Sequence, residues 1–133
     1  MELVIDISGD VVEWQDLLNG TCIATLEGAS PDGQWTLLGS VSWDTRSGSR
    51  ASEGDITVSR ADGSELFGTL AGGEVAEMGE DDTADTGYAM RLEYDIDGGS
   101  GAFTSAAGRA AAQGSLSRDR FHARWIITLP RSG

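Results

Sequence analysis

Lysine is absent from this sequence, and other chemistry-bearing residues are scarce. The chain has one cysteine, Cys22, and one histidine, His122. A disulfide needs two thiols and typical zinc sites need several nitrogen or sulfur ligands, so we expect neither a disulfide nor a metal site. Without lysine there is no Schiff-base chemistry and no usual anchor for pyridoxal phosphate, and we expect no cofactor.

Long apolar runs are also missing. No stretch approaches the ~20 apolar residues that cross a bilayer. Residues 1–7 lack the basic start and the continuous apolar run of a signal peptide. We therefore expect a cytoplasmic protein.

Basic charge is scarce as well. The nine basic residues, all arginine, stand against 22 acidic ones, and the formal net charge is -13. Such a chain repels the phosphates of nucleic acids and the headgroups of anionic membranes. We expect neither as a partner.

What the chain has in quantity is glycine, with 19 residues, against only 2 prolines in a total of 133. A chain of this length fits one domain, here residues 1–133, that hides roughly two-thirds of its unfolded surface. Many glycines between short patterned segments favour an all-β domain over long helices.

The pattern predicts about eight strands joined by glycine-bearing turns, of which Asp62-Gly63 is typical of a tight hairpin. Residues 10–18 fit either a bent strand or a helical turn that plugs a barrel end, and the acidic residues 74–85 fit a solvated loop. Eight strands suit a single closed, mostly antiparallel β-barrel. The expected strands are 2–7, 21–27, 34–43, 53–60, 64–72, 86–97, 108–117 and 120–129.

Period-2 alternation predicts which side chains face the barrel interior. In three segments one face is almost entirely apolar, while the other carries most of the polar and charged residues. The predicted inward sets are Trp35, Leu37, Gly39, Val41 and Trp43; Tyr88, Met90, Leu92, Tyr94 and Ile96; and Phe121, Ala123, Trp125, Ile127 and Leu129.

The interior aromatic residues are the candidate site. Either they fill the barrel, or small residues such as Ala110 and Ala112 leave a cavity among them for one small ligand. Tyr88 and Tyr94 can donate hydrogen bonds to a carbonyl or enolate, although a buried tyrosine hydroxyl often has only a backbone partner. The candidate lining residues are Trp35, Trp43, Phe67, Met90, Leu92 and Trp125.

Nucleophilic catalysis finds little support. His122 is the sole imidazole that a catalytic triad could use, and alternation places it on the charged outer face beside Arg124. Cys22 lies among apolar residues and fits a small buried hydrophobe.

Residues 98–108 read GGSGAFTSAAG, between one predicted strand and the two closing strands. This segment resembles the GGTGRFxGAxG turn of the allene oxide cyclase-like and dirigent-like barrels, including small bacterial members. The resemblance covers roughly residues 53–129, and Ala102 replaces the arginine of that motif. It implies an eight-stranded barrel, often oligomeric, with an apolar cavity that confines a reactive substrate.

Three hypotheses follow. The first is a cofactor-free cyclase or isomerase of specialised metabolism that folds an elongated, polyketide-like substrate for ring closure, with a four-plus-two cycloaddition as one candidate reaction. The second is a lipocalin-like carrier of a small hydrophobic ligand. The third is a barrel with a filled interior whose outer face mediates protein contacts or assembly. Separately, we expect a homodimer as the candidate assembly.

Overall fold

The computed structural model describes residues 2–18, 20–45, 50–77 and 87–129, and it consists almost entirely of strands. A single short 3-10 turn, η1, is the other regular element in these ranges. The elements are β1 (Glu2–Asp16), β2 (Thr21–Ala29), β3 (Trp35–Asp44), β4 (Arg50–Arg60), β5 (Glu65–Glu77), β6 (Tyr88–Ser100), η1 (Gly101–Phe103), β7 (Gly108–Leu116) and β8 (Arg120–Thr128).

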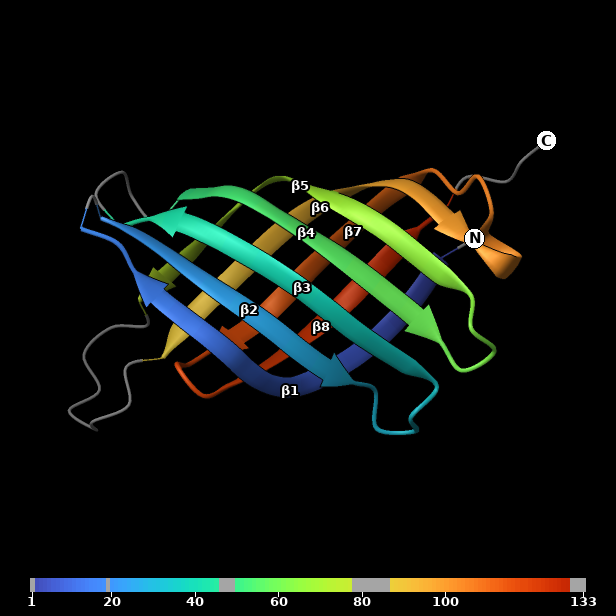
Figure 1. Cartoon of the computed structure of the whole chain (residues 1–133), viewed down its shortest axis with the longest axis horizontal. Helices are drawn as coiled ribbons and strands as arrows, with labels where there is room; N and C mark the ends of the chain where they lie inside the picture. Colours follow the sequence, from blue (N-terminus) through green and yellow to red (C-terminus); the bar gives the residue numbers. More distant parts are fainter. Residues whose placement is uncertain (1, 19, 46–49, 78–86, 130–133) are drawn as a thin grey trace.

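The strands form one closed antiparallel barrel, as the sequence predicted (Figure 1). Each strand pairs with its sequence neighbour, and β8 pairs with β1 to complete the ring. The odd-numbered strands run in the opposite direction to the even-numbered ones, so each barrel end gathers one set of connections. We call them the Trp14 end, where β1, β3, β5 and β7 finish, and the Phe103 end, where η1 lies.

The predicted inward faces of β3, β6 and β8 are confirmed with one qualification. Along β6 the alternate residues from Tyr88 to Ile96 are buried while those between them are exposed, and β8 repeats this pattern. Together with residues of the other strands these side chains form one continuous apolar core. The qualification is Trp35, the first residue of β3, which is only partly buried.

The structure decides two expectations about strands. Of the two alternatives for residues 10–18, the bent strand is confirmed for residues 10–16, because β1 continues to Asp16 with a bulge between Val11 and Glu13 that bends it along the barrel. The acidic stretch is not wholly a loop, since β5 extends to Glu77. The remainder of the predicted loop, residues 78–85, lies outside the described residues.

Phe67 does not line the interior, as the sequence analysis expected. Its side chain is 37% exposed, whereas its neighbour Leu66 is fully buried. Because successive side chains of a strand point to opposite faces, the inward position of Leu66 places Phe67 outside. Because both faces of this segment carry apolar residues, the sequence alone did not show which face points inward.

Gly114 marks a point where two strands come unusually close. It pairs with Ala123 of β8, and a Cβ built on Gly114 would collide with the backbone oxygen of His122. Only a residue without a side chain fits there, as at other tight bends of small barrels. The absence of a side chain at Gly114 therefore allows β7 and β8 to pair closely at this point of the barrel wall.

Candidate functional site

The predicted site residues of β3, β6 and β8 meet in the barrel interior. Trp43, Trp125, Met90, Leu92 and Tyr94 are all at most 1% exposed. Ala110 and Ala112 of β7 also face inward and are buried, which leaves room for the large rings beside them. The structure therefore brings together most of the predicted lining.

Tyr94 and Trp125 form the central ring pair. Their centroids are 5.6 Å apart with planes tilted by 33°. Burial raises the pKa of the Tyr94 phenol, and the negative charge of Asp55 adds to this effect. The hydroxyl therefore stays protonated at neutral pH and is available as a hydrogen-bond donor.

Two indole donors in the core find no acceptor in the described part of the chain. Trp43 Nε1 and Trp125 Nε1 are completely buried and make no hydrogen bond with the part of the chain that the structure describes. A buried donor without an acceptor costs about 1–3 kcal/mol of desolvation. Native structures seldom leave such groups unpaired, so each one calls for an acceptor from a ligand or an ordered water.

Among the described residues, the ionisable side chains buried in the interior are the tyrosines and Cys22. The buried polar residues in the described ranges are three serines, Ser30, Ser42 and Ser64, and no arginine, histidine or carboxylate is buried with them. The described core residues thus offer neutral N–H and O–H groups to a guest, and such donors can polarise a carbonyl.

Trp35 closes the Phe103 end rather than lining the interior. Its ring lies 6.1 Å from that of buried Phe103, and the Arg60 guanidinium lies 4.9 Å from the centre of the Phe103 ring. Ser64 Oγ, which is buried, accepts a hydrogen bond of 2.9 Å from the Ala102 backbone N–H of η1. These contacts close this end of the barrel around two buried residues, Phe103 and Ser64.

The Trp14 end is closed by three aromatic rings. Trp14 of β1 packs edge-on against Trp43 at 5.2 Å and lies 5.5 Å from Tyr88, while Trp43 and Tyr88 are 5.9 Å apart. Tyr88, predicted as a catalytic donor beside Tyr94, thus belongs to a cluster at the barrel end. Sequence reasoning missed Trp14, although the expectation of a plug in residues 10–18 located the right segment.

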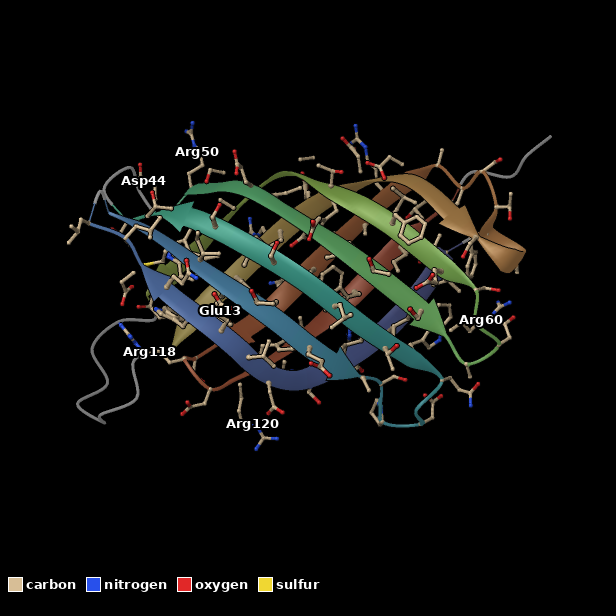
Figure 2. All side chains as sticks on the ribbon, in the orientation of Figure 1. Glu13, Asp44, Arg50, Arg60, Arg118 and Arg120 are labelled. Atoms are coloured by element: carbon tan, nitrogen blue, oxygen red, sulfur yellow. The ribbon has the colours of Figure 1, made fainter. Side chains whose placement is uncertain are left out.

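A polar group surrounds the outer edge of Trp14. Asp16 Oδ1 accepts hydrogen bonds from Trp14 Nε1 at 3.1 Å and from Cys22 Sγ at 3.0 Å. Asp16 Oδ2 accepts one from Arg118 Nη2 at 3.1 Å, and the Arg118 guanidinium lies 5.1 Å from the centre of the Trp14 ring. Figure 2 shows Arg118 near the end of β1, whereas Arg120 extends away from the barrel wall.

These contacts set the protonation states of Asp16 and Cys22. The hydrogen bonds from Cys22 and Trp14 lower the pKa of Asp16, and Arg118 adds to this, so the carboxylate is ionised at neutral pH. Burial raises the pKa of Cys22 to about 11, with a further contribution from Asp16. A thiol that stays protonated at neutral pH is a poor nucleophile, and Cys22 acts here as a hydrogen-bond donor.

Histidine and the larger hollows lie on the outside of the barrel. His122 is exposed on the outer face of β8, as predicted, and it borders a hollow of about 430 Å³ with Arg91, Gln113 and Arg124. This hollow and three others along the barrel wall are lined by other side chains, and Trp43, Met90, Tyr94 and Trp125 are each at most 1% exposed. Binding among these core residues therefore requires their side chains to move.

Two further observations concern the described ranges. No three histidine, cysteine, aspartate or glutamate side chains in residues 2–18, 20–45, 50–77 and 87–129 gather as metal ligands. None of these residues form a helix that is both long and apolar enough to cross a bilayer.

The protein is thus a closed, eight-stranded antiparallel barrel with a donor-rich aromatic core. Comparison with known protein families, curated proteins and solved structures finds no match for this chain. The resemblance to allene oxide cyclase-like barrels therefore stays a prediction from residues 98–108.

Proposed function

We propose that the barrel binds one small, uncharged, largely apolar molecule whose oxygen atoms accept hydrogen bonds from the core. The observation that carries this proposal is the pair of buried indole donors, Trp43 Nε1 and Trp125 Nε1, which find no acceptor among the described residues. A guest oxygen that reaches either donor would remove a desolvation cost of about 1–3 kcal/mol. Binding then gains more than the burial of apolar surface alone provides.

The chemistry of the core defines the class of guest. Met90 and Leu92 offer apolar contact, and Tyr94 offers a neutral hydroxyl beside Trp125. A charged guest would lose its hydration without meeting an opposite charge, which is costly in an apolar interior. A hydrocarbon skeleton with one or two carbonyl groups fits best, and the flexible thioether of Met90 lets the core repack around it.

The first test uses Prodan, an uncharged naphthalene dye with one carbonyl group, titrated by fluorescence. Trp125→Phe keeps an aromatic ring and removes the N–H donor, so we expect the Kd for Prodan to rise by about threefold to tenfold, the effect of one hydrogen bond. Trp35→Phe makes the same chemical change outside the core and should leave the Kd unchanged.

A carbonyl-free naphthylamine of similar size is the matched ligand. We expect Trp125→Phe and Trp35→Phe to have equally small effects on the Kd for this ligand. Absence of Prodan binding to the native protein, or equal effects of both substitutions on Prodan, would contradict binding inside the barrel.

A second function, ring closure on the bound guest, is favoured by the neutral hydrogen-bond donors of the same core. Hydrogen bonds from Tyr94 and Trp125 to a carbonyl withdraw electrons from a conjugated alkene, and confinement holds diene and alkene close together. An intramolecular cycloaddition forms two carbon–carbon single bonds at the expense of two π bonds and needs no base, metal or redox partner. This agrees with the cyclase or isomerase predicted from the resemblance.

Ring closure is tested with a synthetic linear trienone, followed by chromatography and mass spectrometry. We expect the protein to accelerate cyclisation and Tyr94→Phe to lower the rate by about tenfold, as for loss of one donor to developing charge. Tyr88→Phe should matter less, because Tyr88 belongs to the ring cluster at the barrel end. A rate equal to that in buffer would leave a carrier as the function.

The homodimer and the cytoplasmic location stay predictions from the sequence. The carrier and the cyclase use the same core residues and differ only in whether the guest leaves unchanged.

A further inference from the structure

We propose that Trp14 is the gate of the barrel, and that Asp16 and Arg118 form the latch that holds it shut. This inference rests on the proposed function, since a gate matters only if molecules enter the core. It concerns how access to that core is controlled.

The position of Trp14 makes it the outermost member of the ring cluster. Its side chain is partly buried and covers Trp43, which is completely buried. The two rings meet at 5.2 Å, and Trp43 carries one of the two unpaired indole donors. Rotation of Trp14 away from the barrel would uncover Trp43 Nε1 first, so the gate leads directly to a binding group.

The latch consists of contacts that converge on one carboxylate. Asp16 Oδ1 accepts a hydrogen bond of 3.1 Å from the Trp14 indole N–H. Asp16 Oδ2 accepts another, also of 3.1 Å, from the Arg118 guanidinium. Arg118 also lies over the Trp14 ring at 5.1 Å. Trp14 is therefore held at its edge by Asp16 of β1 and at its face by Arg118 of the turn between β7 and β8, two segments far apart in the sequence.

The latch is exposed, which allows it to open. The side chain of Arg118 is 62% exposed and that of Asp16 is 51% exposed. Ion pairs this open to solvent contribute little to stability and weaken further with salt. Releasing Trp14 therefore costs much less than unfolding the strand that carries it.

The opposite end of the barrel is closed differently. Phe103 is buried on η1, and buried Ser64 fixes the backbone of that turn at Ala102. Opening this end would break a hydrogen bond of a buried group, which is costly. The contrast between an exposed latch and a buried closure assigns access to the Trp14 end.

The test is the hydrogen exchange of the indole N–H groups, measured by NMR on the ligand-free protein. Asp16→Asn and Arg118→Gln weaken the latch, and we expect each to accelerate exchange at Trp43 Nε1 by about threefold to tenfold. Glu13→Gln and Arg120→Gln are the matched controls on the same two segments, and Arg120 points away from the barrel (Figure 2). Both controls should leave the exchange rate unchanged.

Unchanged exchange at Trp43 in both latch variants, or equal acceleration in the controls, would overturn the gate. Arg118→Gln alters only an exposed side chain, so it tests the latch even if Asp16→Asn folds poorly. Stopped-flow binding of Prodan adds an independent readout, in which an open latch raises the association and dissociation rates together and leaves the Kd nearly constant. Failure of Prodan to bind the native protein would contradict the proposed function, while indole exchange would still decide whether Trp14 opens.

Discussion

Replacing Gly114 by alanine should destabilise the barrel by about 3 kcal/mol, the upper end of the usual cost of inserting atoms into a packed site. The added Cβ would collide with the carbonyl oxygen of His122, which is backbone and cannot rotate away as a side chain would. Strands β7 and β8 would have to separate where Gly114 pairs with Ala123. Thermal unfolding followed by circular dichroism should show a fall in Tm of about 10 °C.

Gly72→Ala is the control for this prediction. A Cβ at Gly72 meets no atom within 4 Å, although this residue also lies in a strand. We expect its Tm to stay within about 2 °C of the native value, since substitutions away from tight contacts have small effects. Similar losses in both variants would mean that glycine content, rather than the close approach of β7 and β8, determines stability.

Trp125→Ala should cost about 3–5 kcal/mol, as for other large aromatic residues removed from a core. The Trp125 side chain is completely buried and stacks with Tyr94. Urea unfolding measures the loss, and Trp35→Ala is the control. Because Trp35 is only partly buried at the Phe103 end, we expect it to cost less than about 2 kcal/mol.

Indole should rescue the Trp125→Ala variant. The substitution leaves an apolar cavity, and such cavities bind small aromatic molecules of matching shape. Binding to the folded state alone raises Tm with ligand concentration. A Tm that does not respond to indole would indicate that the core collapses into the vacated space, which would count against its ability to hold a guest.

The barrel and most of its interior were predictable from local pattern. Strand β6 alternates buried and exposed residues without interruption from Tyr88 to Asp97, so its inward face can be read with a period of two. Trp125 is buried between two exposed neighbours in the same way on β8. Eight short strands, three of them with such clear alternation, leave few architectures that bury every apolar face.

Other features depend on strand pairing that a local pattern does not contain. The inward face of β5 cannot be read from its sequence, because Leu66 and Phe67 are adjacent and both apolar. Only the packed barrel shows that Leu66 is the buried one. The cluster around Asp16 needs Cys22 from the next strand and Arg118 from a turn 102 residues later. Nothing in the local sequence of Asp16 indicates either partner.

The pairing of β8 with β1 has a consequence for the chain before the ring is complete. While β8 is missing, β1 and β7 each present a row of unpaired backbone groups, the kind of edge on which strands of other molecules can add. β8 is the last of the described strands to be synthesised, so the β1 edge stays open through most of translation. Acidic residues outnumber basic ones by 22 to 9 in this chain, and we expect this excess of negative charge to make incomplete chains repel one another during that interval.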